Sequence, residues 1–235
     1  MGCAEVEKAN ERAFPAISAQ ALVFLCEEEP SDVISVPKTN KYTAVSILFV
    51  MKNKESIMEH NKEFVASRSY EPFAASVLPR RKLAILTCMD TRLTELLPAA
   101  LGIKNGDANI IKNAGAIILD PFGVTMRSLL ISVYMLEVRE IFVFGHKDCG
   151  VRGINASKIK EKMLSMGVTQ EKIDLVESCG IKLEGCLKGF EDTCESVRDT
   201  VKIIKTHPLL PEGINVLGFV MDPFTGEIEE VKVCY

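Results

Sequence analysis

Short, nearly continuous apolar runs recur along the chain after about residue 80. Four of them have the length of a β-strand: residues 82–87, 108–115, 139–146 and 214–222. Strands that are buried on both faces show this pattern, because neither face of such a strand meets water. The pattern therefore predicts four buried strands.

Helical patterns fill the gaps between these runs. The expected helices are residues 94–102, 126–138 and 192–206. Strands that alternate with helices pair in parallel through right-handed crossovers. We therefore predict an α/β fold in three layers, with a mostly parallel central sheet flanked by helices. Residues 227–233, after the turn-like "DPFTG", are expected to be an edge hairpin partner.

The N-terminal part of the chain follows a different pattern. Residues 56–67 have amphipathic spacing and predict a helix that packs on the sheet or on a second subunit. Before it lie a helix-like patch at 14–29 and a β-like run at 42–50, and neither clusters groups that do chemistry. We therefore divide the chain into an N-terminal extension of unknown role, 1–52, and an α/β domain, 53–235.

Composition narrows the class of partner. The chain has 28 Lys and Arg against 32 Asp and Glu, a formal net charge of -4, so no basic field attracts nucleic acid or anionic lipid. No apolar run approaches the roughly 18 to 20 residues that cross a bilayer. The eight cysteines lack the regular spacing of a small disulfide scaffold. We expect a soluble, cytoplasmic protein that acts on a small molecule.

Side chains with distinctive chemistry follow the first and third predicted strands. Cys88, Asp90 and Arg92 come at the end of the first strand, and His146 and Cys149 at the end of the third. In an open parallel sheet, ligands bind beyond the carboxyl ends of the strands, where the strand order reverses. If the first and third strands are neighbours, with the second on the other side of the first, these five groups meet at such a point.

Two thiolates and one imidazole make the donor set of a catalytic zinc site, since three protein ligands leave a fourth position open. Sulfur and imidazole also favour Zn²⁺ over magnesium or calcium. Two thiolates offset the charge of the ion, so a bound water needs help to ionise near neutral pH. Asp90 is the candidate for that help, and Arg92 can hold its carboxylate through two hydrogen bonds.

Three motifs resemble those of the β-class carbonic anhydrases. They are C-x-D-x-R at 88–92, "KNAGA" at 112–116 and H-x-x-C-G at 146–150. The resemblance covers roughly residues 53–235 and is greatest to the short prokaryotic branch. It implies a zinc lyase, a carbonate dehydratase that interconverts carbon dioxide and bicarbonate through a zinc-bound hydroxide.

The resemblance also implies roles for the five residues and a quaternary structure. Cys88, His146 and Cys149 would be the zinc ligands, with Asp90 and Arg92 as the catalytic pair. A homodimer or a higher even oligomer is expected, with a neighbouring subunit forming part of the pocket wall.

Structural roles compete with these interpretations. Asp90 and Arg92 would also serve as a helix N-cap and its salt-bridge partner. We interpret Asp148 as structural and Lys147 as solvated. Gly115, after the second strand, is expected to form a backbone wall of the carbon dioxide niche, because only a small residue lets the chain approach so closely.

The remaining cysteines and histidines are not assigned as metal ligands. Cys179, Cys186 and Cys194 are spaced by seven and eight residues, a helical rhythm that predicts core-facing positions and not a second metal site. His60 lies on a charged predicted helix, and His207 precedes a proline that ends one. Either histidine could shuttle protons if it faced the pocket.

Two further functions stay open from the sequence. The same site could hydrolyse carbon disulfide or carbonyl sulfide, which are linear relatives of carbon dioxide. The protein could also be a non-catalytic binding protein that zinc stabilises, in which Asp90 closes the fourth position of the metal.

Overall fold

The computed structural model describes the backbone of residues 41–233 and the side chains of residues 52–233. The chain divides into two compact units between Ala74 and Ala75, and each unit is described by itself. The helix-like patch expected at 14–29 lies outside the described residues. The boundary predicted after residue 52 stays a prediction.

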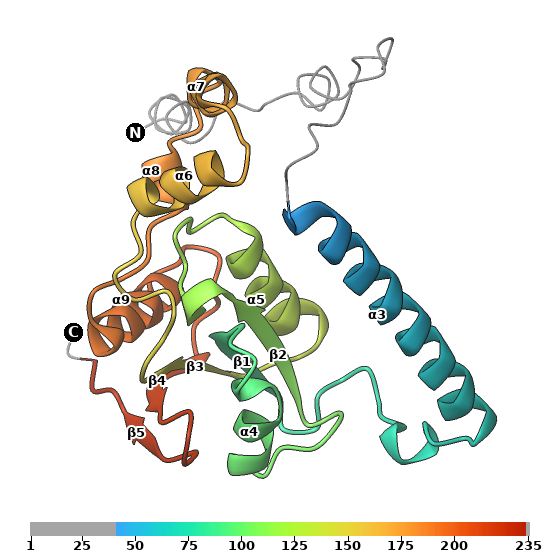
Figure 1. Cartoon of the computed structure of the whole chain (residues 1–235). Helices are drawn as coiled ribbons and strands as arrows, with labels where there is room; N and C mark the ends of the chain where they lie inside the picture. The colour runs from blue at the N-terminus through green and yellow to red at the C-terminus, as the bar shows by residue number, and fades with distance from the viewer. Residues whose placement is uncertain (1–40, 234–235) are drawn as a thin grey trace, which may run out of the picture. The chain divides into compact units, whose positions relative to one another are not determined.

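A five-stranded sheet with the order β2-β1-β3-β4-β5 forms the centre of the second unit (Figure 1). Its strands are β1 (Leu83–Cys88), β2 (Ala108–Asn113), β3 (Glu140–His146), β4 (Asn215–Met221) and β5 (Ile228–Glu230). The first four pair in parallel, and β5 pairs antiparallel with β4 at the edge. The four predicted strands and the hairpin partner are therefore confirmed.

Helices cover both faces of this sheet and complete the three predicted layers. One face carries α5 (Val124–Met135) and α9 (Thr193–Lys205), which share a buried aliphatic core with β1, β3 and β4. On the other face α4 (Leu93–Ala100) packs Leu93 and Leu97 in a second core with Phe144 and Met221. The central strands contribute side chains to both cores, because successive side chains of a strand point to opposite faces of the sheet.

The topology of β1 places the candidate residues. All six residues of β1 are buried, as expected of a central strand. β1 pairs with β3 on one side and with β2 on the other, so the chain reverses its strand order at β1. Because Thr87 lies opposite Phe144, β1 and β3 end side by side at the switch point that the sequence analysis anticipated.

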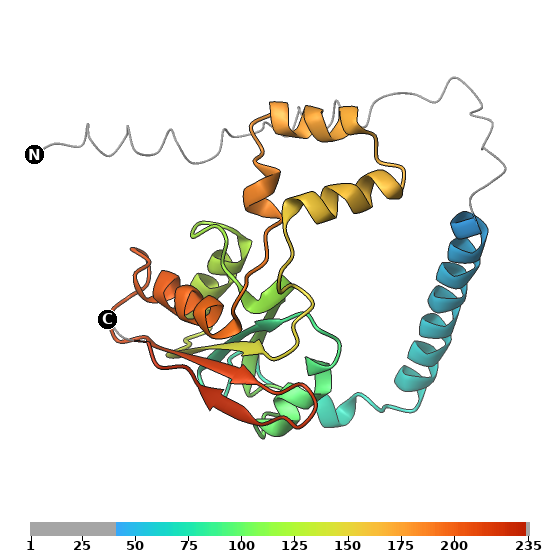
Figure 2. The same ribbon diagram turned by 60° about the vertical axis from the view of Figure 1, so that its left-hand side comes forward.

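A helical excursion, α6 to α8, was not predicted from the sequence. It consists of α6 (Ala156–Ser165), α7 (Gln170–Ser178) and α8 (Leu183–Cys186), and Figure 2 shows α6 and α7 running side by side away from the sheet. Its three helices bury only Ala156 and Ile173. The hydrophobic periodicity of this segment is therefore too weak to predict helices from the sequence.

The first unit contains a long helix. α3 (Lys41–Ala66) is followed by the 3-10 turn Glu71–Phe73, and the helix predicted at 56–67 is confirmed as part of α3. The β-like interpretation of 42–50 is wrong, because these residues are helical. No Gly or Pro interrupts the segment 41–66, and helix propagation is cooperative, so the weak β preference of the apolar run is overridden.

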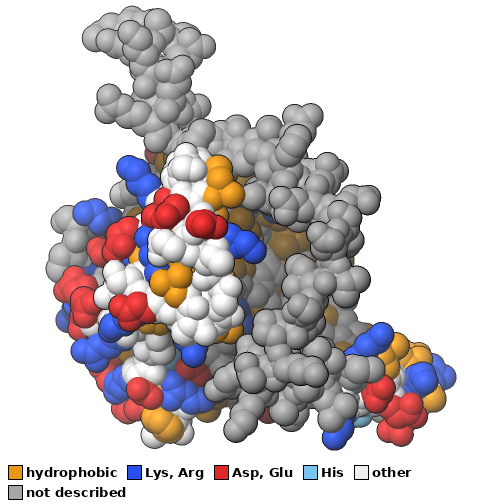
Figure 3. Space-filling view, turned by 45° about the horizontal axis from the view of Figure 1, so that its top comes forward, with side chains coloured by type: hydrophobic (Ala, Val, Ile, Leu, Met, Phe, Trp, Pro, Cys, Tyr) orange, Lys and Arg blue, Asp and Glu red, His pale blue; other side chains and the backbone are white. Residues whose placement is uncertain are grey.

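Charge on the surface is mixed. On the face shown in Figure 3, the described Lys and Arg side chains alternate with Asp and Glu side chains, with apolar side chains among them. Among the described residues, no helix combines the length and the apolar character needed to cross a membrane.

Asp107 fixes the start of β2 and gives a test of the fold. Its carboxylate accepts the backbone N–H of Lys104 at 2.8 Å and the Arg80 guanidinium at 2.9 Å, and these partners lower the pKa of Asp107 below its ordinary 3.8. Asp107→Asn should lower Tm by a few degrees at pH 7, because the amide is uncharged.

The pH dependence of this loss checks its cause. A lowered pKa stabilises the fold above about pH 4, and the contribution disappears as the pH falls through the folded-state pKa. The Tm gap between the wild type and Asp107→Asn should therefore narrow below pH 4 in thermal unfolding. A gap that widens on acidification would contradict this assignment.

Candidate metal centre and catalytic pair

The ends of β1 and β3 bring Cys88, His146 and Cys149 together. The two sulfur atoms lie 3.9 Å apart, and the ligand atoms of all three residues lie within 4.8 Å of one another. All three side chains are buried. The separation is far longer than the roughly 2.05 Å of a disulfide, so the cysteines are free thiols.

The histidine ring presents one unused nitrogen to this cluster. Nδ1 lies 2.9 Å from the carbonyl oxygen of Lys147 and donates to it. Nε2 is fully buried and has no hydrogen-bond partner. Unpaired buried nitrogen is costly, and a ring whose Nδ1–H is held by a carbonyl has the arrangement of a metal-ligating histidine.

The distances fit a zinc ion. A tetrahedral ion with bonds of 2.3 Å to sulfur holds two sulfur atoms about 3.8 Å apart, and the observed separation is 3.9 Å. The cluster is therefore a Cys₂His set that could bind a metal, with one coordination position left for a non-protein ligand.

The two thiols differ in their electrostatics. The Cys149 thiol hydrogen-bonds to the Cys88 sulfur. This bond, the neighbouring His146 ring and the backbone N–H groups of Asp90 and Gly115 together outweigh burial and lower the pKa of Cys88. The same pairing, with burial, raises the pKa of Cys149. Cys88 is thus the more acidic of the two thiols, and a metal bound through both sulfurs as thiolates would displace the proton of Cys149.

Asp90 and Arg92 form a tight pair beside the cluster. Arg92 donates from Nε to Oδ1 of Asp90 at 3.1 Å and from NH2 to Oδ2 at 2.8 Å. These bonds lower the pKa of Asp90 to about 2. Oδ2 lies 3.8 Å from Nε2 of His146, so the carboxylate faces the cluster.

The helix-cap interpretation of this pair is only partly met. Oδ1 of Asp90 also accepts the backbone N–H of Arg92 at 2.9 Å, which tightens the turn before α4. The N-cap position of α4 is Arg92 itself, and it makes no side-chain cap. Asp90 therefore shapes the turn and faces the cluster at once.

Gly115 packs directly on the first sulfur. Its backbone N–H donates to Sγ of Cys88 at 3.4 Å, and its φ of 86° lies in the left-handed region that glycine tolerates. A Cβ at this position would lie 3.1 Å from the ring of Phe190 and 3.3 Å from Val151. Gly115 is thus a backbone donor to the cluster, and its role in the carbon dioxide niche stays a prediction.

A cavity of about 550 Å³ opens onto the site. Its lining combines the polar site residues with apolar side chains: Cys88, Met89, Asp90, Thr91, Arg92, Gly150, Val151 and Ile154. Val151 and Ile154 lie where the excursion α6 to α8 begins. Two backbone hydrogen bonds of 2.8 Å join the two ends of this excursion. The N–H of Gly153 donates to the carbonyl of Phe190, and the N–H of Gly189 donates to the carbonyl of Ile154.

Two neighbours of the ligands take parts that the sequence did not reveal. The Asp148 carboxylate accepts NH1 of Arg92 at 3.0 Å, and its carbonyl oxygen accepts NH2 at 2.9 Å. The ring of Phe224, in the turn after β4, lies 5.4 Å from the Arg92 guanidinium carbon. In the sequence, the only indication that Asp148 belongs to the site was its position next to Cys149. Nothing in the sequence indicated a part for Phe224.

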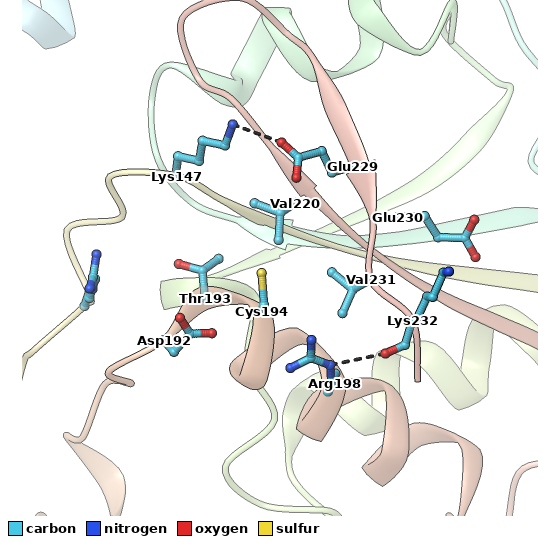
Figure 4. Close-up of a pocket in the computed structure, with 11 residues that line it drawn as sticks. Lys147, Asp192, Thr193, Cys194, Arg198, Val220, Glu229, Glu230, Val231 and Lys232 are labelled. Carbon is cyan, nitrogen blue, oxygen red and sulfur yellow. Dashed lines mark hydrogen bonds and ion pairs between the residues drawn. The ribbon is translucent and has the colours of Figure 1, made fainter. Parts of the chain in front are cut away.

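Lys147 is paired and not simply solvated as interpreted. Its Nζ lies 3.2 Å from the Glu229 carboxylate of β5, and Figure 4 shows the two side chains pointing toward each other. These two side chains line a cavity with a volume of about 400 Å³, which Cys194 and Arg198 also line. Arg198 donates there to the carbonyl of Lys232.

The prediction that Cys179, Cys186 and Cys194 face the core is wrong. All three are exposed, and they lie at the end of α7, in α8 and in the first turn of α9. The prediction assumed that the three cysteines lie on one helix, whereas they belong to three separate elements, so their spacing does not put them on one face. His207 is buried, with Nδ1 accepting the backbone N–H of Leu209, and lies away from the cluster on the α5 side.

The fold and site together define a class: a parallel α/β protein with a buried Cys₂His cluster and an Asp-Arg pair at its switch point. A family model described as carbonic anhydrase matches residues 83–228. The chain belongs to this family, in its β class.

Individual relatives agree with that assignment. "Putative carbonic anhydrase YvdA" of Bacillus subtilis (strain 168) is 49% identical over 181 residues, which are 77% of this chain and 92% of that protein. The crystal structure of β-carbonic anhydrase isoform I from Trichomonas vaginalis is 32% identical, with a TM-score of 0.68, and the match covers 77% of this chain and 98% of that one. A carbon disulfide hydrolase of Acidianus sp. (strain A1-3) is 30% identical over 162 residues, 64% of this chain and 77% of that protein.

Gly115→Ala tests the packing around the first sulfur. We expect it to lower the free energy of unfolding by about 2 to 3 kcal/mol, because an added Cβ meets both a left-handed backbone and crowded neighbours. Gly102→Ala is the matched control, since Gly102 also has a positive φ, 60°, but nothing lies within 4 Å of its added Cβ. It should cost about 1 kcal/mol in urea unfolding. Equal losses would contradict close packing at Gly115.

Proposed function

We propose that this protein is a zinc enzyme that hydrates carbon dioxide reversibly to bicarbonate. The observation that carries the proposal is the buried Cys88–His146–Cys149 cluster, whose free Nε2 faces the Asp90 carboxylate. Zn²⁺ bound there would lower the pKa of a water on its open position from 15.7 toward about 7.

Asp90 would orient that water without acting as its base. Arg92 holds the pKa of Asp90 at about 2, so the carboxylate is ionised throughout the range of pH 6 to 9. Within that range Asp90 accepts a hydrogen bond and does not titrate. A pH dependence of activity near neutrality would therefore not arise from Asp90.

Arg92 has two tasks in this proposal. Its two hydrogen bonds occupy both oxygens of Asp90, so the carboxylate is held at the edge of the site and does not swing onto the metal. Its charge also offsets that of Asp90 beside the anionic sulfurs. This arrangement supports an open fourth position over the alternative in which Asp90 closes it.

The cavity offers an apolar wall to a non-polar substrate. Val151 and Ile154 line it beside the polar site residues. Carbon dioxide has no net dipole and needs such a surface more than hydrogen-bond donors. The product bicarbonate is charged and would leave through the open mouth.

Hydrolysis of carbon disulfide is the second candidate function. The observation in its favour is the 30% identity to a carbon disulfide hydrolase. The larger sulfur atoms of that substrate demand a wider approach to the same three ligands. Stopped-flow assays with carbon dioxide, carbon disulfide and carbonyl sulfide separate the two, and turnover of the sulfur compounds alone would reject our main proposal.

A homodimer, or a higher even oligomer, forms part of the proposal. β2 is an edge strand whose Ile110 is exposed, and α3 of the first unit exposes Ile57, Met58 and Val65. Such apolar surfaces are typical of subunit contacts. Sedimentation velocity decides between the states, and a monomer at micromolar concentration would contradict an obligate oligomer.

A cytoplasmic location is also part of the proposal. Its support is that the five described cysteines form no disulfide, which suits a reducing compartment.

Cys149→Ala tests the ligand assignment. The variant should lose most of its bound zinc after dialysis, because two protein ligands hold the ion much less tightly than three. Metal content by atomic emission measures this. Cys194→Ala is the matched control, since it removes an exposed thiol and should retain zinc. A full zinc complement in Cys149→Ala would exclude Cys149 as a ligand.

Asp90→Asn tests the catalytic pair. We expect zinc to stay bound and hydration of carbon dioxide to fall about 100-fold, because an amide positions the water less well and no longer balances Arg92. Stopped-flow rates from pH 6 to 9 measure the loss. Glu95→Gln, which neutralises an exposed acid in the first turn of α4, should leave the rate unchanged. Full activity in Asp90→Asn would remove Asp90 from the mechanism.

A further inference from the structure

The Arg92 guanidinium lies where three loops meet at the carboxyl ends of the strands. It belongs to the loop after β1, and it contacts Asp148 in the loop after β3 and Phe224 in the turn after β4. Its side chain is 31% exposed, whereas that of Asp90 is 16% exposed. The outer side of Arg92 thus needs its own partners to stay in place.

Asp148 binds Arg92 through two different atoms. Its carboxylate accepts NH1 at 3.0 Å and its carbonyl oxygen accepts NH2 at 2.9 Å. The backbone of Asp148 has a φ of 53°, a left-handed conformation that few residues other than Gly, Asn and Asp adopt readily. This conformation accompanies the presentation of both oxygen atoms to one guanidinium.

The ring of Phe224 lies over the guanidinium, with its centroid 5.4 Å from the central carbon. The backbone of the turn is held in place, because the Asp222 carboxylate accepts the backbone N–H of Phe224 at 2.9 Å, while Phe224 itself is 74% exposed. The guanidinium carbon lies over the face of the ring, and this contact adds to the hydrogen bonds of Arg92. An aromatic face attracts a cation within about 6 Å.

We propose that Asp148 and Phe224 are positioning residues that hold Arg92 against Asp90. The inference rests on the proposed function, since it assigns them a part in the same reaction. Asp90 reaches the site along one edge of the guanidinium, while Asp148 fixes NH1 and NH2 from the other loop. Phe224 adds a cation–π contact to the same guanidinium. The orientation of Asp90 therefore depends on residues that do not touch the substrate.

Four variants test the proposal. Asp148→Gly removes the carboxylate without straining the left-handed backbone, and Asp148→Asn keeps an oxygen acceptor in the same place. Phe224→Leu removes the aromatic face, and Phe224→Trp keeps it. The matched control is Glu229→Ala, which removes an exposed acid that pairs with Lys147 and not with Arg92.

The first measurement is independent of activity. Hydrogen exchange of the Arg92 Nε–H, followed by NMR and assigned by its loss in Arg92→Lys, reports how firmly Asp90 and Arg92 are paired. Exchange should accelerate several-fold in Asp148→Gly and Phe224→Leu and stay at the wild-type rate in Asp148→Asn, Phe224→Trp and Glu229→Ala. Unchanged exchange in both removal variants would overturn the proposal.

The second measurement is the rate of carbon dioxide hydration at equal zinc content. Asp148→Gly and Phe224→Leu should lower kcat/KM about three- to tenfold, with recovery in the conservative variants. On an Arg92→Lys background the two removals should have no further effect, because they act through Arg92. Equal losses on both backgrounds, or a full rate despite faster exchange, would overturn the positioning role. A wild type without hydration activity would refute the proposed function instead, and exchange alone then decides whether Arg92 is held.

Discussion

The parallel pairing of β1 with β3 is the constraint on which the site depends. Residues 88 and 146 are far apart along the chain, yet the register that sets Thr87 opposite Phe144 makes the two strands end together. Side chains of both strands are buried on both faces of the sheet. A slip of one residue would exchange the side chains that pack in the two cores, so neither core would keep its packing. The hydrophobic core therefore fixes the positions of the Cys88 and His146 side chains before any metal binds.

This rigidity makes the polar chemistry possible inside a core. Two sulfur atoms and an imidazole are buried beside Leu93, Leu97 and Phe144, where unpaired polar groups are unfavourable. Local hydrogen bonds satisfy part of the demand, from Gly115 to the Cys88 sulfur and from the ring of His146 to the Lys147 carbonyl. Nε2 is left without a partner. The three side chains could therefore hold a metal ion, which would give Nε2 a partner.

The charge of Arg92 balances the anionic character of the site. Four of its hydrogen bonds go to oxygen atoms of Asp90 and Asp148, and they span the loops after β1 and β3. An unpaired carboxylate beside the thiolate of Cys88 would be repelled and would take up a proton. The guanidinium therefore keeps Asp90 charged and aimed, and it ties two loops that the sheet alone brings only near each other.

The sequence predicted the parts of this structure that periodic burial determines. The central strands are buried on both faces, so their apolar runs could be recognised in the sequence. The candidate ligand set was then inferred from the residues that follow β1 and β3. The excursion α6 to α8 was missed because it buries only Ala156 and Ile173. The segment 42–50 was misread because its local β preference competes with a helix that continues beyond it to Ala66. The contacts of Arg92 with Asp148 and Phe224 depend on loop conformation, which no periodic pattern encodes.

X-ray absorption at the zinc edge tests the central claim most directly, because it counts the atoms around the ion in the purified protein. Our account predicts two sulfur atoms at about 2.3 Å, one imidazole nitrogen at about 2.0 to 2.1 Å and one light-atom ligand at the remaining position. A shell without sulfur, or one with four sulfur atoms, would contradict the assignment of Cys88, His146 and Cys149 as the ligands.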